Sequence, residues 1–295
     1  MIFNTKIGGL HMLSVRLKSD SGLMGPTHAL SAIALSLLIA WLASDFMFNK
    51  VLGSTDVIVF MSALIIITGA SLMPDLDAVQ STSINTLGIV GVILSKGMRA
   101  VSAAIQSILR SKSDAASPDP HRGFWHTFIS AGLIGVLITS LTSINKDVFE
   151  AFGKTFTVSM LIVTFIIYIS LQLVMASLFK SFYKKSKGNF LSSLGLQIVS
   201  LISALALLIS LPPELSYKWV GAAVSIGWLL HLFGDMLTVA GVPVLFPLKF
   251  KGKRWWNFRF PFGIKAGGFI EKAILIPIFV IILIVSMINV IPILG

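Results

Sequence analysis

Long apolar segments, each near the length of a membrane-crossing helix, dominate this 295-residue sequence. Hydrophobic residues make up 55% of the chain, charged residues make up 12%, and the mean hydropathy is +0.91. A soluble globular domain carries roughly 25% charged residues. The sequence therefore predicts a polytopic membrane protein, an all-α helical bundle that forms a single membrane-embedded domain over residues 1–295.

Seven segments are candidates for membrane-spanning helices, because each approaches the roughly 20 apolar residues that a bilayer requires. They are residues 28–43, 57–73, 125–141, 156–179, 190–211, 219–239 and 273–294. An eighth apolar segment, residues 84–109, is amphipathic and is interrupted by Lys96, Arg99 and glycines. We expect it to lie on the membrane interface or to dip into it.

The basic residues orient these spans. If the amino terminus is cytoplasmic, 19 of the 23 lysines and arginines fall in segments on the cytoplasmic side. Such a bias favours that orientation, with the carboxyl terminus outside. The net charge of +11 then fits loops that face anionic inner-leaflet headgroups, and nucleic acid is a weaker candidate partner.

Histidines and aspartates gather at the cytoplasmic ends of these spans. Their positions at the edge of apolar segments are costly unless the side chains have partners. The chain has no cysteine, so imidazole and carboxylate are its available transition-metal ligands. The sequence predicts a site for one or two zinc or manganese ions, with candidate ligands His28, Asp75, Asp77, His121, His126, His231 and Asp235.

Each motif also has a structural explanation when it is taken alone. His231 and Asp235 share a helical face, as a chelating pair requires, but this spacing is weak evidence by itself. Asp75 and Asp77 follow Pro74 and could be a helix stop with capping carboxylates. His28 could be an interfacial hydrogen bonder. The expected convergence of all the motifs on one face favours a metal site.

Two further residues are candidates for catalysis. Glu271, at the predicted cytoplasmic start of the last span, could serve as a general base or could simply complement the helix dipole. Arg122 could clamp a phosphate bidentately or bind lipid headgroups. The basic and aromatic loop at residues 249–259 is expected to anchor the chain to anionic lipid, or to form a rim that recruits a lipid phosphate.

The motifs resemble a family of LexA-regulated bacterial inner-membrane proteins described as metal-dependent hydrolases, the YdjM-like family. The matching residues are Thr27-His28, Pro74-Asp75-Leu76-Asp77, His121-Arg122-Gly123-Phe124-Trp125-His126, residues 231–243 (HLFGDMLTVAGVP), Phe246-Pro247, Arg259-Phe260-Pro261 and Glu271. The resemblance implies a bacterial inner-membrane protein with a metal-dependent hydrolytic site at these His and Asp positions. It also implies a distant kinship with zinc-dependent phospholipase C.

Three features depart from the family pattern. Trp125 stands where relatives often have threonine, and we expect its bulk to narrow access to the site. Residues 156–211 look like an inserted helix pair that is separable from the site. Residues 1–23 could be an upstream extension if the chain starts at Met24.

These observations favour an integral membrane hydrolase that acts on a phosphoester or a lipid-linked substrate. A bound ion would activate water for attack on a phosphorus or carbonyl centre. A metal-coupled or proton-coupled transporter is one alternative, since ionisable residues inside spans also mark ion paths. A catalytically silent membrane scaffold with a structural metal is another.

Overall fold

The computed structural model describes residues 24–78, 84, 86–114, 121–151, 153–178, 190–212 and 215–294. The possible extension over residues 1–23 lies outside the described residues. The long helices are α1 (Gly25–Leu42), α2 (Val57–Ala70), α4 (Gly88–Leu109), α5 (Phe128–Leu141), α6 (Val158–Leu178), α8 (Phe190–Ser210), α9 (Trp219–Met236) and α10 (Ile276–Leu294). The prediction of an all-α membrane bundle is confirmed.

Six of the described helical segments are long and apolar enough to cross a membrane. They are Gly25–Leu42, Val57–Asp77, Gly88–Leu109, Val158–Leu178, Trp219–Met236 and Glu271–Leu294, while Phe128–Leu141 and Leu194–Ser210 are shorter apolar helices. At 14 residues, α5 is about 21 Å long and falls short of the roughly 30 Å hydrocarbon core. The length and composition of α4 also fit a membrane-spanning helix. Its position on the membrane interface therefore stays a prediction.

Within the described residues, four short helices connect or extend these elements. Two are single 3₁₀ turns, η2 (Pro74–Asp77) and η3 (Phe124–His126), and they carry the Pro-Asp and paired-histidine motifs. Two are π-helices, η1 (Asp45–Leu52) after α1 and η4 (Glu271–Leu275) before α10. The predicted site residues therefore lie largely on short turns at the ends of long helices.

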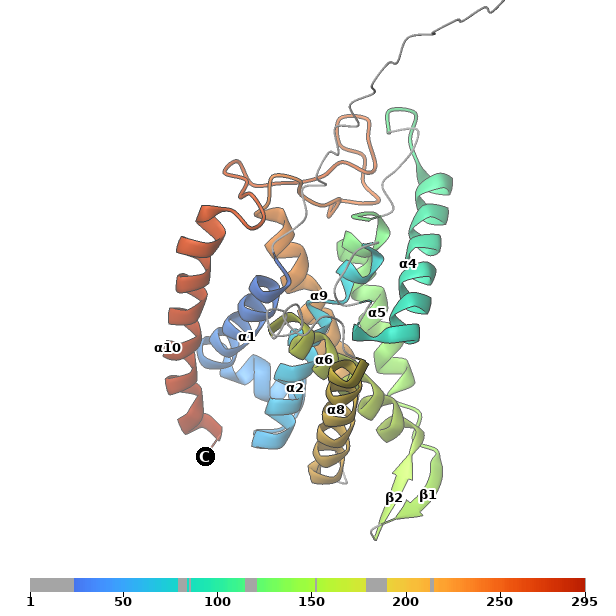
Figure 1. Ribbon diagram of the computed structural model, residues 1–295, viewed down its shortest axis with the longest axis vertical. Coiled ribbons are helices and arrows are strands. Elements are labelled where there is room, and N and C mark those ends of the chain that lie inside the picture. Colours follow the sequence, from blue (N-terminus) through green and yellow to red (C-terminus); the bar gives the residue numbers. More distant parts are fainter. Residues whose placement is uncertain are drawn as a thin grey trace, which may run out of the picture.

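The centre of the bundle is built around α9, which packs against α5, α2 and α1. A Cβ added at Gly227 of α9 would lie 2.2 Å from the carbonyl oxygen of Ile67, so glycine is required for α9 to approach α2. This contact brings His231 and Asp235 close to the end of α2. In Figure 1, α10 and α4 stand on opposite sides of the bundle, and the loop between α9 and α10 covers one end.

Helix α6 belongs to the core rather than to a separable insertion. It packs against α2, α1 and α8, and Val163, Ile167 and Leu173 are fully buried. Leu173 also packs in a cluster with Leu72 and Leu76, directly beside the aspartate motif. These contacts count against the expectation that residues 156–211 can be removed without disturbing the site, and that expectation stays a prediction.

A short antiparallel hairpin, which the hydropathy pattern did not predict, precedes α6. Strands β1 (Asp147–Ala151) and β2 (Lys154–Thr157) pair across a turn at Gly153, whose φ is 69°. The rings of Phe149 and Phe156 stack with centroids 4.9 Å apart. The helix therefore begins at Val158 instead of residue 156, and Figure 1 shows the hairpin projecting beyond the helices.

Candidate metal centre

Four side chains from three separate segments converge on one point. Asp75 comes from η2, His126 from η3, and His231 and Asp235 from α9. One potential ligand atom of each lies within 4.8 Å of all the others. The paired-histidine turn, the aspartate motif and the i,i+4 pair are therefore one site, as the sequence predicted.

The spacing between these atoms suits a tetrahedral ion. His231 Nε2 lies 3.6 Å from Asp235 Oδ2 and 3.7 Å from Asp75 Oδ1. His126 Nε2 lies 3.8 Å from the same two oxygen atoms. Ligands about 2.0–2.2 Å from a tetrahedral zinc ion are about 3.3–3.6 Å apart. These pairs are too far apart for hydrogen bonds, and their separations are slightly larger than those around a bound ion.

Several atoms of the cluster are buried without a hydrogen-bond partner among the described residues. They are His126 Nδ1 and Nε2, His231 Nε2, and both carboxylate oxygens of Asp235. Buried polar groups that lack a partner are rare and cost free energy. A cation between them would compensate two carboxylates and two imidazoles at once, so this donor set fits a divalent transition metal.

The second nitrogen of His231 is fixed by the backbone. His231 Nδ1 lies 2.8 Å from the carbonyl oxygen of Ser71, which can only accept a hydrogen bond. Nδ1 therefore carries the proton, and the lone pair of Nε2 faces Asp75 and Asp235. Metal-binding histidines are commonly oriented in this way by a backbone carbonyl.

Asp77 and His121 form a second layer on one side of the cluster. Asp77 is fully buried, and its Oδ1 lies 2.6 Å from His121 Nδ1 while its Oδ2 lies 3.6 Å from His126 Nδ1. Burial disfavours the protonated ring, but the hydrogen bond and charge of Asp77 outweigh this effect and raise the pKa of His121. Asp77, His121 and His126 also form a second group that could hold an ion.

His28 and Arg122 approach Asp235 from other directions. His28 Nε2 lies 3.3 Å from Asp235 Oδ1, and the His28 ring stacks on His231 with centroids 4.2 Å apart. Arg122 donates a hydrogen bond from NH1 to the carbonyl oxygen of Gly241, and its NH2 lies 3.9 Å from Asp235 Oδ2. All seven predicted ligands and Arg122 are thus brought together.

Helix α4 holds the paired-histidine turn in place, and this contact was not predicted from the sequence. Phe124 donates its backbone N–H to Ser102 Oγ at 3.0 Å. A Cβ at Gly123 would lie 2.1 Å from the same Oγ atom, so this close approach needs glycine. The buried residues of α4 include Gly91, Ser95, Ser102 and Gln106. This stripe of small and polar residues on an apolar helix is the sequence feature that could have indicated the packing face of α4.

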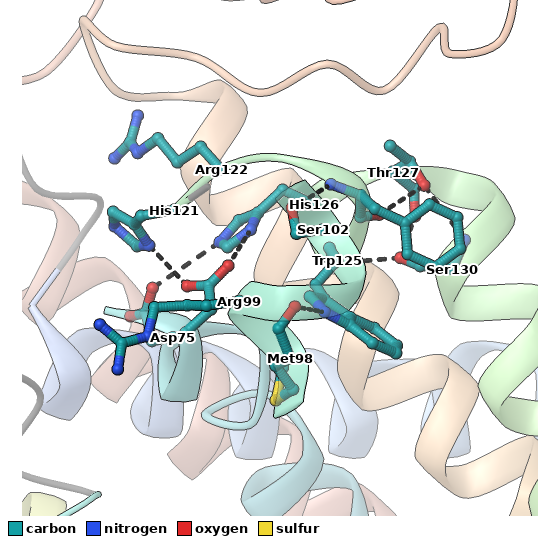
Figure 2. Close-up of polar contacts among 12 residues, drawn as sticks. Asp75, Met98, Arg99, Ser102, His121, Arg122, Trp125, His126, Thr127 and Ser130 are labelled. Atoms are coloured by element: carbon teal, nitrogen blue, oxygen red, sulfur yellow. Dashed lines mark hydrogen bonds and ion pairs between the residues drawn. The ribbon is translucent and has the colours of Figure 1, made fainter. Parts of the chain in front are cut away.

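Trp125 faces α4 and does not point into the cluster. Its indole donates to the carbonyl oxygen of Met98 at 2.7 Å, and its own carbonyl accepts from the Trp228 indole at 2.7 Å. Figure 2 shows Trp125 directed at Met98 while His126 is directed at Asp75. The expectation that Trp125 narrows access to the site is therefore replaced by a structural role.

The structure does not bring Glu271 into the cluster. Glu271 is fully buried, with Oε1 accepting the backbone N–H of Met24 at 2.8 Å and Oε2 accepting that of Gly267 at 2.6 Å. Both carboxylate oxygens are engaged in tying the start of α10 to the start of α1. These contacts give Glu271 a structural role and count against its role as general base, which stays a prediction.

Comparison with protein families gives one result. The family model described as YdjM inner membrane protein matches residues 23–292, which is most of the chain and includes every residue of the cluster. No curated protein and no solved structure matches the chain.

Proposed function

This chain belongs to the YdjM inner membrane protein family, and on that premise we propose that it is an integral membrane hydrolase that uses one zinc or manganese ion. One observation carries the proposal: four potential ligands, three of them buried and Asp75 partly exposed, lie within 4.8 Å of one another, and most of their facing atoms lack hydrogen-bond partners among the described residues.

Asp75, His126, His231 and Asp235 would hold the ion. Two aspartates offset its charge, and two imidazoles complete a set of four protein ligands, to which the ion would add water or a substrate oxygen by expanding to five-coordinate. When bound, such an ion activates water and polarises the bond under attack. His28 Nε2 lies 3.3 Å from Asp235 Oδ1, where it would help to fix the orientation of that carboxylate.

A single bound ion explains the positions of Asp77 and His121 better than two bound ions do. His126 presents Nε2 to Asp75 and Asp235 and presents Nδ1 to Asp77. A neutral imidazole ligates through one nitrogen and carries a proton on the other. Asp77 Oδ2, 3.6 Å from His126 Nδ1, would then be the acceptor toward which the proton on this nitrogen points. The short hydrogen bond between Asp77 and His121 completes a chain from the ligand to a partly exposed ring.

His121 is the best-placed proton carrier in the cluster. Its side chain is 20% exposed, whereas His28, His126 and His231 are fully buried. Asp77 holds its Nδ1, and its raised pKa suits a group that gives a proton to a leaving group and takes one from water. We therefore assign His121 the acid-base role that the sequence had suggested for Glu271.

The position of the buried charges weighs against the transporter alternative. Among the described residues, the buried histidine, acidic and basic side chains are His28, Asp77, Arg122, His126, His231, Asp235 and Glu271. Their contacts with one another, or with the start of α1, place them at a single end of the bundle. A transport path would need polar groups across the full thickness of the membrane.

Metal analysis of purified protein tests the proposal. We expect about one zinc or manganese ion per chain and hydrolysis of one or more members of an ester panel. His231→Ala should lose both, while Lys253→Ala, at an exposed position, should retain both. Protein that neither retains nor takes up either metal would refute the proposal. Bound metal without hydrolysis of any ester would favour the scaffold alternative.

A further inference from the structure

Arg122 is a buried arginine with most of its hydrogen-bonding capacity unused. Only 8% of the residue is exposed. NH1 donates to the carbonyl oxygen of Gly241 at 2.9 Å, but Nε and NH2 are buried and have no hydrogen-bond partner among the described residues. A guanidinium offers five N–H donors, and leaving them unsatisfied away from water is costly.

The backbone conformation of Arg122 is also unfavourable. Its φ of 64° lies in the left-handed region, which a non-glycine residue seldom occupies. Such strain persists only where surrounding structure enforces it, and it is concentrated at functional sites. The turn places the guanidinium beside His121 and the cluster, as Figure 2 shows. The strained backbone thus serves the placement of this side chain.

Asp235 does not account for the unused donors. Arg122 NH2 lies 3.9 Å from Asp235 Oδ2, which is beyond hydrogen-bonding distance. That oxygen also lies 3.6 Å from His231 Nε2 and 3.8 Å from His126 Nε2, so it faces the proposed ion position. The guanidinium and the ion position are therefore neighbours that share Asp235, and the free donors need a different anion.

We propose that Arg122 binds the phosphoryl group of the substrate, so that the proposed hydrolase, on which this inference rests, acts on phosphate esters. Nε and NH2 form one edge of a guanidinium fork, which matches two oxygens of a phosphoryl group. A tetrahedral phosphoryl group can offer two oxygens to this fork and a further oxygen to the ion. A planar carboxylate has only two oxygens, so it has no third oxygen for the ion while both oxygens accept from the fork.

Binding of inorganic phosphate tests this assignment without relying on catalysis. Manganese-loaded protein is titrated with phosphate, and binding near the ion is followed by the paramagnetic relaxation of the phosphorus-31 signal. Acetate serves as the carboxylate probe. Arg122→Asn is the main variant, because asparagine tolerates a positive φ and should preserve the turn. Arg122→Lys keeps the charge but loses the fork.

The matched control is Arg259→Asn. Arg259 also donates NH1 to a backbone carbonyl, that of Val239 at 2.7 Å, but it is exposed and has no contact with the cluster among those described. We expect the phosphate dissociation constant to rise about 10- to 100-fold in Arg122→Asn and by less in Arg122→Lys. It should stay within about twofold of the wild type in Arg259→Asn.

Three results would overturn the assignment. One is phosphate binding by Arg122→Asn with unchanged affinity, and another is acetate binding as tightly as phosphate. The third is loss of manganese from Arg122→Asn, which would make Arg122 a partner that positions Asp235. If the wild type holds no metal, the proposed function fails. Phosphate binding by metal-free wild type and metal-free Arg122→Asn then still shows whether Arg122 binds the phosphoryl group.

The same assay separates two sources of the phosphoryl group. Glycerol 3-phosphate and phosphatidic acid in detergent micelles are compared as competitors of inorganic phosphate. Both share the phosphomonoester that Arg122 would recognise. Tighter competition by the lipid indicates a membrane-derived substrate, and tighter competition by the soluble ester indicates a water-soluble one. Competition by neither ester would overturn the assignment of substrate class.

Discussion

Replacing Asp77 by asparagine is the sharpest test of the proposed division between ligands and orienting groups. The carboxylate is fully buried, with Oδ1 at 2.6 Å from His121 Nδ1 and Oδ2 at 3.6 Å from His126 Nδ1. The amide keeps the shape of the side chain, but its NH₂ group would present a donor to His126 Nδ1 where the carboxylate presents an acceptor. His126 would then be pushed toward the tautomer with its proton on Nε2, the nitrogen assigned to the ion.

The magnitude follows from this geometry. Asp77 acts on the ion only through His126, and the loss of such an orienting partner weakens metal binding about 10- to 100-fold. This factor corresponds to roughly 1.4–2.7 kcal/mol. Asp235→Asn alters a proposed ligand instead, and it should leave no stoichiometric metal after dialysis.

The assay combines two measurements. Mass spectrometry gives the number of ions per chain, and competition with a zinc chelator gives their affinity. With one ion, the wild type holds about one equivalent, and Asp77→Asn reaches the same stoichiometry at higher free zinc. Two equivalents in the wild type and one in Asp77→Asn would refute the single-ion site. Unchanged zinc affinity in Asp77→Asn would refute the orienting role.

Three further predictions address topology, packing and pH. Cysteines at the exposed positions Ser113 and Ser216 should label from opposite sides, and labelling of position 113 from outside intact cells would reverse the predicted orientation. Gly69→Ala would place a Cβ 2.3 Å from a side-chain atom of α6 and should lower stability by roughly 1–3 kcal/mol in thermal unfolding. Gly132→Ala is the control, because a Cβ there meets open space. Equal effects of the two substitutions would contradict this packing. In metal-free protein, His121→Gln should lower the melting temperature more at about pH 6 than at about pH 9. The pKa of His121 is higher in the folded protein than in the unfolded chain, so its contribution to stability is full below the unfolded-state pKa and is lost as the pH rises through the folded-state pKa. A pH-independent effect would contradict the ion pair between His121 and Asp77.

The convergence of the site was predictable because it depends on the order of the spans. Alternate helix ends meet at the same face, so residues as far apart as His28 and Asp235 could be assigned to one cluster from the charge pattern and the hydrophobic segments. Helix type and approximate bounds followed from segment length. The most reliable inference was therefore topological, and it needed no knowledge of side-chain contacts.

The roles of individual side chains could not be predicted in the same way. The predicted topology puts Glu271 on the same face as the cluster, yet its carboxylate accepts hydrogen bonds from two backbone amides. The docking of α4 onto the paired-histidine turn depends on Ser102 and Gly123, whose contact is visible only in three dimensions. Hydropathy also concealed the β1–β2 hairpin, because its two strands are short and border a long apolar helix.

The distribution of the cluster along the chain sets an order of assembly during synthesis. Asp75 and His126 enter the membrane well before His231 and Asp235, which belong to α9, the penultimate long helix. Because chains are made from the amino terminus, the earlier pair waits for α9 to be inserted. A nascent chain released before α9 would present an aspartate and a histidine without their partners. Premature termination before α9 would thus yield a product that lacks two of the four potential ligands and cannot assemble the centre.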